Sequence, residues 1–327
     1  MSFRRSPLHA IALILALAVL VGFPLPARAV LNCTFTITNL NFGTIDLTAN
    51  TTFDTTATFS ATCSGGSSGA NARICPNINA GSGGVASGGD PRRMLNGSNQ
   101  LNYNMFQDSA RTTVWGSYLW SSPGVTPPTI NITLNSSGAG NTTRTIFGRV
   151  SAAQQTLPPG TYTSSFSGSQ TQIAYQQTSS NNCATIGSTN ATSASFTVTA
   201  TYSSVCHLAS TNLNFGSTGV LVSSVAGTST VTATCSATTP YTVGLNGGNA
   251  NAIDPTQRKM ANGAVQVTYG LYQNSAHTSP WGNVSGNWVG GTGSGLGQGL
   301  TVFGLIPAQT TPAPATYSDT IVATVTY

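Results

Sequence analysis

Cysteine is the residue type in this sequence with the clearest potential for chemistry. Six are present, in chain order Cys33, Cys63, Cys75, Cys183, Cys206 and Cys235. Thiolates bind metals, carry out redox chemistry or form disulfides, and the first two uses commonly employ a Cys-x-x-Cys motif. No such motif occurs, and neither His207 nor His277 has a cluster of further ligands near it in the sequence. The pattern therefore favours disulfides, and we expect no metal and no cofactor.

Motifs for catalysis and nucleic-acid binding are weak. The run Gly65-Gly66-Ser67-Ser68-Gly69 matches the nucleophile elbow of hydrolases, but it stands in a Gly/Ser-rich stretch without a strand-to-helix turn. The glycine-rich run from Gly290 to Gly299 is not followed by the helix that a phosphate-binding loop requires. Only 5% of the residues are charged, against about 25% in a typical domain. Carboxylates for acid–base catalysis and basic residues for nucleic acid are thus scarce, and we expect neither an enzyme nor a nucleic-acid partner.

Residues 1–29 have the pattern of a secretory signal peptide. Arg4 and Arg5 precede an apolar run from Ile11 to Gly22, and Ala27-Arg28-Ala29 supplies a small-x-small cleavage pattern. The apolar run is shorter than the roughly 20 residues that a membrane span needs. We expect the mature chain to begin at Val30, with its net charge reduced from +5 to +2 because three arginines leave with the signal. It would then fold in an oxidising compartment, where disulfides persist.

An internal repeat dominates the rest of the chain. The recurring segments are Cys33 with Leu40-Asn41-Phe42-Gly43 and Cys206 with Leu213-Asn214-Phe215-Gly216, Arg93-Met94-Leu95-Asn96-Gly97 and Lys259-Met260-Ala261-Asn262-Gly263, Trp115-Gly116 and Trp281-Gly282, and Gly160-Thr161-Tyr162 and Ala315-Thr316-Tyr317. The order of the segments is the same in both copies, which composition bias cannot produce. We therefore expect two copies of one domain, at residues 30–203 and 204–327.

Each copy has the pattern of an all-β domain. Two segments alternate apolar and polar residues with period two, and their apolar members are Phe196, Val198, Ala200 and Tyr202, and Ile321, Ala323, Val325 and Tyr327. Asn-Gly pairs at 96–97 and 262–263 predict tight hairpin turns. These features indicate two tandem immunoglobulin-like β-sandwiches. The equivalent pairs Cys33–Cys63 and Cys206–Cys235 would each link one sandwich, and Cys75–Cys183 would join two segments that only the first copy has.

The two copies differ after the Tyr162 strand and its equivalent. The first copy continues through a segment that contains Cys183 before a comparable strand ends at Tyr202, and the second copy has no such continuation after Tyr317. Either an additional strand completes the first sandwich while the second lacks one, or an insertion interrupts a single strand. We favour the additional strand.

The repeated motifs resemble those of the spore coat protein U domain. The resemblance rests on the Cys–Leu-Asn-Phe-Gly opening, the Arg/Lys-Met-x-Asn-Gly turn, the Trp-Gly loop and the ending that starts at Thr316-Tyr317-Ser318-Asp319-Thr320. It covers nearly all of the expected mature chain, twice. That family supplies subunits of archaic (Csu-type) chaperone–usher pili. Two such pilin-type domains in one chain resemble the tip adhesin of these pili rather than a one-domain shaft pilin.

The resemblance implies a mechanism of assembly. Pilins of this kind lack one strand, and a periplasmic chaperone, then the N-terminal extension of the next subunit, fills the gap by strand addition at the outer-membrane usher. It implies that the second copy is the acceptor, with contacts at Ile321, Ala323, Val325 and Tyr327. Only three residues precede Cys33 in the expected mature chain, too few to donate a strand. We therefore expect export through the periplasm to the cell surface, at the pilus tip.

The resemblance also implies attachment to abiotic or host surfaces, and biofilm formation, through apolar loops of the first copy. The matching residues are Tyr118, Leu119, Trp120, Val125, Pro127 and Pro128, with Leu157, Pro158 and Pro159 as a second loop. Trp115 and Trp281 recur in both copies, so we expect them in the cores.

Two other functions remain open. One is a lectin-like head, in which aromatic side chains stack on sugars and polar groups of Asp90, Arg92, Asp108 and Arg111 form hydrogen bonds. Arg92 and Asp108 have equivalent or near-equivalent positions in the second copy, which favours a structural role for these two. The other is a secreted spore-coat or matrix protein outside any pilus.

Overall fold

The computed structural model describes residues 30–121, 124, 126–180 and 182–327, and the expected signal peptide, residues 1–29, lies outside this range. Nearly all regular structure in the described part is β-strand, with three short 3-10 turns as the remainder. No helix among these residues has the length and hydropathy to span a membrane. The expectation of an all-β fold is confirmed.

The strands fall into two groups, called here the first sandwich (β1–β11) and the second sandwich (β12–β19). The first comprises β1 (Asn32–Ile37), β2 (Leu40–Ile45), β3 (Phe53–Ser64), β4 (Asn71–Ile78), β5 (Arg92–Asn96), β6 (Asn99–Phe106), β7 (Ile130–Thr133), β8 (Gly140–Val150), β9 (Gly160–Phe166), β10 (Thr171–Gln177) and β11 (Phe196–Tyr202), with 3-10 turns η1 (Leu47–Ala49), η2 (Gly168–Gln170) and η3 (Cys183–Thr185). The second comprises β12 (Cys206–Ser210), β13 (Val225–Cys235), β14 (Pro240–Leu245), β15 (Arg258–Asn262), β16 (Val265–Tyr272), β17 (Val289–Thr292), β18 (Gly297–Ile306) and β19 (Ala323–Thr326).

Strand formation follows the period-two alternation of the sequence. In β11 every second residue from Phe196 to Tyr202 is buried and the threonines between them face outward. β1 has the same pattern, with Cys33, Phe35 and Ile37 inward. Threonine and other β-branched residues suit these half-buried strands.

The first sandwich has one large sheet and one small sheet. The large sheet has the order β1-β3-β8-β6-β5-β9-β11-β2, and the small sheet the order β10-β4-β7. β1 and β2 lie at opposite edges of the large sheet, although only Thr38 and Asn39 separate them in the sequence. The large sheet therefore curls until its two edges meet at consecutive residues.

The second sandwich repeats this order but is incomplete. Its sheets have the orders β12-β13-β18-β16-β15 and β17-β14-β19, which correspond to β1-β3-β8-β6-β5 and β7-β4-β10. Among the described residues, no strand corresponds to β9, β11 or β2.

Three disulfides connect these elements. Cys33–Cys63 joins β1 to β3, and Cys206–Cys235 joins the equivalent strands β12 and β13. Cys75–Cys183 joins β4 to η3 and spans 108 residues of sequence. All three expected pairs are present, and no described cysteine is free.

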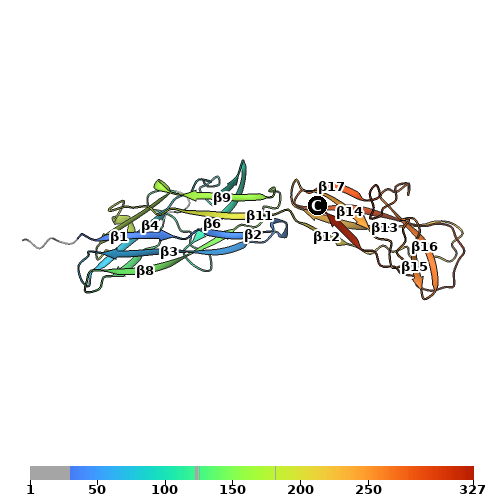
Figure 1. Cartoon of the computed structure of the whole chain (residues 1–327), viewed down its shortest axis with the longest axis horizontal. Coiled ribbons are helices and arrows are strands. Elements are labelled where there is room, and N and C mark those ends of the chain that lie inside the picture. The colour runs from blue at the N-terminus through green and yellow to red at the C-terminus, as the bar shows by residue number, and fades with distance from the viewer. Residues whose placement is uncertain (1–29, 122–123, 125, 181) are drawn as a thin grey trace, which may run out of the picture.

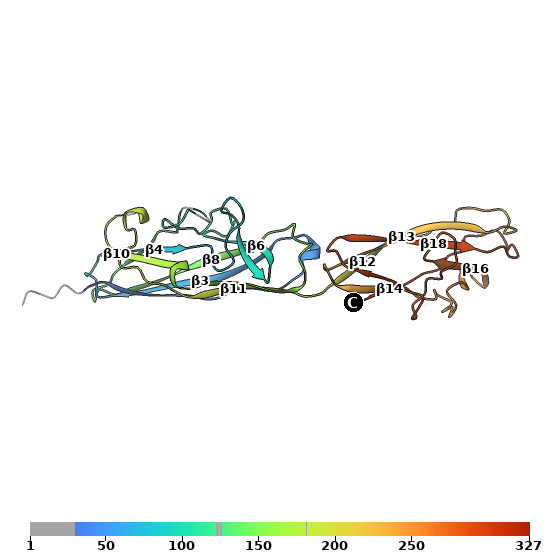
Figure 2. The same ribbon diagram turned by 90° about the horizontal axis from the view of Figure 1, so that it is seen from above.

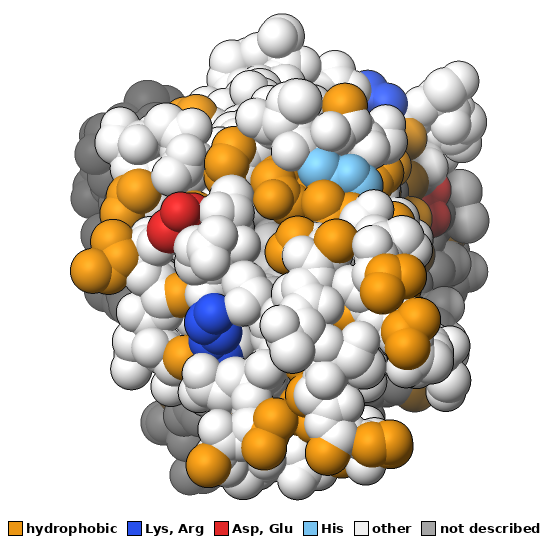
Figure 3. All heavy atoms as spheres, turned by 90° about the vertical axis from the view of Figure 1, so that its right-hand side faces the viewer, with side chains coloured by type: hydrophobic (Ala, Val, Ile, Leu, Met, Phe, Trp, Pro, Cys, Tyr) orange, Lys and Arg blue, Asp and Glu red, His pale blue; other side chains and the backbone are white. Residues whose placement is uncertain are grey.

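The two sandwiches lie end to end along one long axis, as two views at right angles show (Figures 1 and 2). The C-terminus lies beside β14 and β17, toward the end of the second sandwich that meets the first (Figure 1). The opposite end of the second sandwich carries mostly uncharged side chains, with hydrophobic ones at several places between polar ones (Figure 3).

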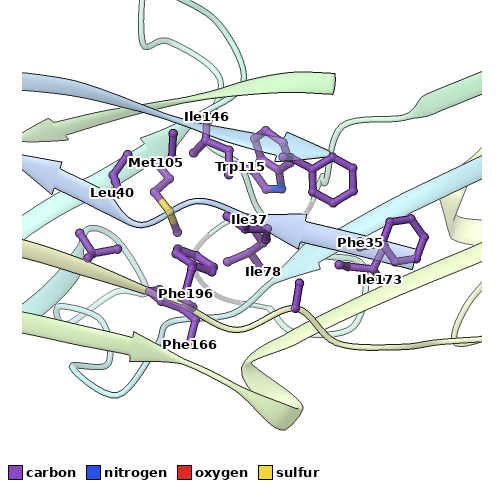
Figure 4. Packing of buried hydrophobic residues seen from close by; sticks show 14 of the residues in the cluster. Phe35, Ile37, Leu40, Ile78, Met105, Trp115, Ile146, Phe166, Ile173 and Phe196 are labelled. Atoms are coloured by element: carbon purple, nitrogen blue, oxygen red, sulfur yellow. The ribbon is translucent and has the colours of Figure 1, made fainter. Parts of the chain in front are cut away.

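Each sandwich has its own hydrophobic core. The first core includes Phe59. Figure 4 shows Trp115 in the same core, together with the stacked rings of Phe166 and Phe196. The second core contains Trp281 at the place of Trp115, so both tryptophans are buried as expected. The two buried clusters share no residue. The exact domain boundary, between residues 203 and 204, stays a prediction.

Candidate functional site

β11 completes the first sandwich by pairing on both sides. It runs antiparallel to β9, from the pair Phe196–Phe166 to the pair Tyr202–Gly160, and parallel to β2. Its inward side chains are all buried in the first core. β10, which precedes it, belongs to the other sheet and corresponds to β19. The additional strand expected after Phe166 is therefore present, and it is not an interruption of a single strand.

The second sandwich has an open groove where β11 would lie. The segments that correspond to the two neighbours of β11 contain Leu213-Asn214-Phe215-Gly216 and Tyr317-Ser318-Asp319, and neither forms a ladder. Their pairing is limited to one isolated bridge, between Ala261 and Ser318. The groove between them has a volume of about 660 Å³. Without a counterpart of β11, the two segments on either side of the groove lack the hydrogen-bonding partner that would make them strands.

The groove is apolar at its base. Its buried members come from both sheets and are Val231, Leu245, Tyr269, Leu271 and Val302. Half-buried side chains form its walls: Leu208, Leu213 and Phe215 on one side, and Met260, Ile321 and Ala323 on the other. Equivalent residues show what a strand would change, because Leu40 and Tyr162 are fully buried beside β11 whereas Leu213 and Tyr317 are not.

A hydrogen-bonded carboxylate lies in the groove lining. Tyr269 Oη donates to Asp319 Oδ2 at 2.7 Å, and the backbone N–H groups of Asn249 and Thr320 donate to Oδ1 at 2.7 and 2.8 Å. Burial and the neighbouring Asp319 carboxylate together raise the pKa of Tyr269. The phenol therefore stays a neutral donor, and three donors satisfy the carboxylate before any strand covers it.

A buried arginine supports the base of the groove. Arg258 Nη2 donates to the carbonyls of Leu245 and Trp281 at 2.9 and 2.8 Å, and Nε donates to the carbonyl of Asn246 at 2.8 Å. Burial lowers the pKa of its guanidinium. This side chain fixes the end of β14 against the Trp281 loop, so that Leu245 keeps its place in the groove.

The equivalent arginine, Arg92, was a candidate sugar ligand. Its guanidinium is fully buried and donates to the carbonyls of Ile78, Asn79 and Trp115 and to the side chain of Asn104. Burial lowers its pKa to about 10. Arg92 is therefore not available to a glycan, because all its hydrogen bonds are made inside the first sandwich.

The other candidate sugar ligands also have partners in the fold. Asp108 accepts hydrogen bonds from the backbone N–H groups of Thr112 and Thr113, which lower the pKa of its carboxyl. Arg111 donates to two carbonyls and pairs with Asp54 at 3.2 Å. Asp90 accepts from Asn104. These side chains stabilise turns, and the structure does not bring them into one pocket.

The expected surface-binding residues after Trp115 separate into two groups. Tyr118 is 43% exposed, and Leu119 and Trp120 are half-buried, in a loop that is tied to β4 because Tyr118 N–H donates to Asn77 Oδ1 at 2.9 Å. Pro127 and Pro128 are buried, so the expectation that they meet a surface is wrong; they lead directly into the buried strand β7. Val125 lies outside the described residues.

The second expected loop, Leu157-Pro158-Pro159, has another role. Leu157 packs against the first core, and the carbonyl of Pro158 accepts a hydrogen bond from Tyr162 Oη at 2.7 Å. The adjoining Gln155 carbonyl lies so close to Gly295 of the second sandwich that a β-carbon there would collide with it. This loop is therefore at the junction of the two sandwiches and not at a free tip, which corrects the expectation.

The expected contact strand was only partly identified from the sequence. Ile321 and Ala323 line the groove, Val325 packs against the second core from β19, and Tyr327 is exposed beyond the end of that strand. The opposite wall, from Leu208 to Phe215, was not anticipated as a contact. Its signal was the repeated Leu-Asn-Phe-Gly motif, which in the first sandwich forms β2, the neighbour of β11.

Comparisons with known proteins support this architecture. Residues 21–169 and 192–324 match the family described as Spore Coat Protein U domain. Protein U of Myxococcus xanthus is 31% identical over 127 residues, which cover 35% of this chain and 71% of that protein.

Two solved structures align with nearly the whole chain at low sequence identity. One shares the fold: a chain of the CsuC–CsuE chaperone–tip adhesion subunit pre-assembly complex from archaic chaperone–usher Csu pili of Acinetobacter baumannii, 14% identical, with a TM-score of 0.53 and coverage of 90% of this chain and 100% of that one. The other is the CupB6 tip adhesin from Pseudomonas aeruginosa, 13% identical, with a TM-score of 0.37 and coverage of 91% and 94%.

Proposed function

The chain belongs to the Spore Coat Protein U domain family, and from this membership we propose that it is the tip adhesin of an archaic chaperone–usher pilus. The observation that carries the proposal is the contrast between the two sandwiches. The first is closed by its own β11, and the second has a groove with an apolar base at the equivalent place. One chain thus combines a finished domain with one acceptor site.

The groove would accept a strand from a partner. β11 shows the geometry, because it lies parallel to β2 and antiparallel to β9 and places every second side chain inward. Each fully buried apolar side chain contributes about 1.5–3 kcal/mol. A periplasmic chaperone would supply the strand first, and the N-terminal extension of the next subunit would replace it at the usher.

The first sandwich would then be the head. It would lie at the outer end of the fibre, on the cell surface, and mediate attachment to abiotic or host surfaces and biofilm formation. Among the expected contact residues, Tyr118, Leu119 and Trp120 retain exposed area for this role. An aromatic side chain that docks on an apolar surface contributes through its large area, without charge to desolvate.

A structural role in a coat or matrix outside a pilus is the second candidate, because the family model is that of a spore coat domain and Protein U is a relative. Such a protein has no need of a strand-donating chaperone. Binding of a donor strand therefore separates the two functions.

The test uses a synthetic peptide with the sequence of residues 196–202 as a model donor. We expect it to raise the melting temperature of the purified chain, because it binds the folded second sandwich and not the unfolded chain. The same peptide with Asp in place of Val198 is the matched control and should have no effect. An unchanged melting temperature with the first peptide, at concentrations up to the millimolar range, would contradict the proposal.

A further inference from the structure

The strand that closes the first sandwich continues directly into the second. β11 ends at Tyr202, and β12 begins at Cys206 after three linking residues. β12, the first strand of the second sandwich, therefore follows β11, the strand that completes the first sandwich, without a long linker. In a pilus joint, the donated strand fills the groove of one subunit and leads into the sandwich of the subunit that donates it. The junction between β11 and β12 has the same connectivity within one chain.

At this junction the two bodies touch each other outside the groove. His207 Nε2 of β12 lies 2.8 Å from Asp46 Oδ2, which stands at the start of the turn η1. The carbonyl of Gln155 lies against Gly295 on the other side of the contact. The segments 46–50 and 153–156 are themselves linked, because Ala153 N–H donates to Asn50 Oδ1 at 2.9 Å. They form the end surface on which the following body rests.

The second sandwich has an equivalent end surface that nothing in the described chain covers. Leu221 is buried in the second core as Leu47 is in the first, and its backbone N–H donates to Thr311 Oγ1 at 2.9 Å, so the same two segments are again linked. Val220 and Val222 flank Leu221 and are 58% and 78% exposed. Val220 and Val222 thus stand in the segment that corresponds to residues 46–50, where Asp46 touches the second sandwich.

We propose that Val220 and Val222 form a second contact for the subunit that fills the groove, made by the body of that subunit and not by its donor strand. The inference rests on the proposed function. The occupant is a β-sandwich subunit whose donor strand is followed closely by its first body strand, as β11 is followed by β12. Because this segment presents the exposed Val220 and Val222 and no carboxylate, the facing residue of that subunit is apolar and not a histidine or other cation, which would lose hydration beside two valines without gaining a counter-charge.

The position of this surface agrees with the direction of the groove. A strand that lies as β11 does would run from the Ile321 end of the groove to the Tyr317 end, since Phe166 and Tyr162 are the equivalent partners of Phe196 and Ala200. The end of the second sandwich that it reaches is the one remote from the first sandwich. That end carries separated hydrophobic side chains on a surface with little charge (Figure 3).

Cysteine accessibility tests the inference in the assembled fibre. The Val222→Cys variant is compared with Thr301→Cys, whose position is exposed on the outer face of β18 and points away from the groove. The rate of labelling by a membrane-impermeant maleimide is measured for the purified chain bound to the 196–202 peptide and for pili sheared from the cells that produce them. We expect labelling of the Val222→Cys variant to be at least tenfold slower in pili than in the peptide complex, and labelling of the Thr301→Cys variant to be equal in both.

The outcomes separate the two proposals. Equal labelling of the Val222→Cys variant in pili and in the peptide complex overturns the contact at Val222 while leaving the groove as proposed. Absence of the chain from sheared pili overturns the proposed function and the contact with it. As a second measurement, Val220→Asp with Val222→Asp should leave the affinity for the 196–202 peptide unchanged and reduce the amount of the chain retained in pili at least fivefold; full retention overturns the inference.

Discussion

Phe166 of β9 and Phe196 of β11 stack with their ring centroids 4.5 Å apart and their planes only 6° from parallel. The pair lies at the first step of the ladder by which β11 closes the first sandwich. In the second sandwich Ile321 stands at the place of Phe166, on the wall of the open groove and without such a partner. Phe196 of β11 therefore covers Phe166 in the first sandwich, whereas no side chain covers Ile321 in this way in the second.

Phe196→Ala should destabilise the first sandwich by about 3–5 kcal/mol, as expected for truncation of a buried aromatic side chain. Chemical unfolding followed by tryptophan fluorescence, to which the buried Trp115 of the first core contributes, measures the change. Thr197→Ala, the adjacent outward position, should change stability by less than about 0.5 kcal/mol. Equal effects of the two substitutions would show that β11 does not close the core.

Ile321→Asp should weaken binding of the 196–202 peptide at least tenfold, because the strand would bury a new carboxylate against the hydrophobic core of the second sandwich. Val322→Asp is the matched control, since Val322 is the next residue and points away from the groove with 55% of its side chain exposed. Titration calorimetry on the purified variants measures both affinities. The idea fails if the two variants bind equally well.

Replacement of Tyr118, Leu119 and Trp120 together by Ser should abolish attachment to polystyrene while pili still assemble. The control is Val284→Ser, because Val284 follows Trp281-Gly282 as Tyr118 follows Trp115-Gly116 and is also exposed. Adherent cells are counted and pili are quantified by immunoblot of sheared fibres. Undiminished attachment of the triple variant would assign adhesion to another part of the head.

Removal of the Cys75–Cys183 bond by substitution of both residues with Ala should cost about 2–5 kcal/mol, since the bond closes a loop of more than 100 residues in the unfolded chain. We expect the loss in thermal unfolding and an increase in proteolytic cleavage between β10 and β11. An unchanged cleavage rate would mean that hydrogen bonds alone order this insertion.

The junction between the sandwiches should weaken in acid. Burial raises the pKa of Asp46, but hydrogen bonds from Thr48 and His207 outweigh it and hold the pKa below its ordinary value. A carboxyl whose pKa is lowered by folding stabilises the fold above the ordinary carboxyl pKa of about 3.9, and this contribution is lost as the pH falls through the lowered value. The stability difference between the native chain and Asp46→Asn should therefore be full at pH 6 and decrease as the pH falls below the ordinary carboxyl pKa. A pH-independent difference in unfolding free energy would contradict this.

The sequence predicted the repeat, the all-β fold, the disulfides and the closing strand, because each depends on local alternation or on the spacing of identical motifs. It predicted one wall of the groove from Ile321 and Ala323 but not the other, since the Leu-Asn-Phe-Gly motif is identical in both copies and forms a strand only in the first. The exposure of Leu213 and Phe215 depends on a strand elsewhere in the fold. The same limitation applies to Pro127 and Pro128, whose burial depends on the fold around them and not on their own sequence.

Strand β11 also determines how a pulling force would pass through the first sandwich. It lies along the long axis of the molecule and joins the first sandwich to the second through three residues (Figure 1). Tension along a fibre would pull β11 lengthwise against its ladders with β9 and β2, so that hydrogen bonds on both edges resist sliding together and do not open one at a time. Under such tension the first sandwich would be loaded in shear, and the strand that takes up the tension belongs to the same covalent chain that leads into the second sandwich.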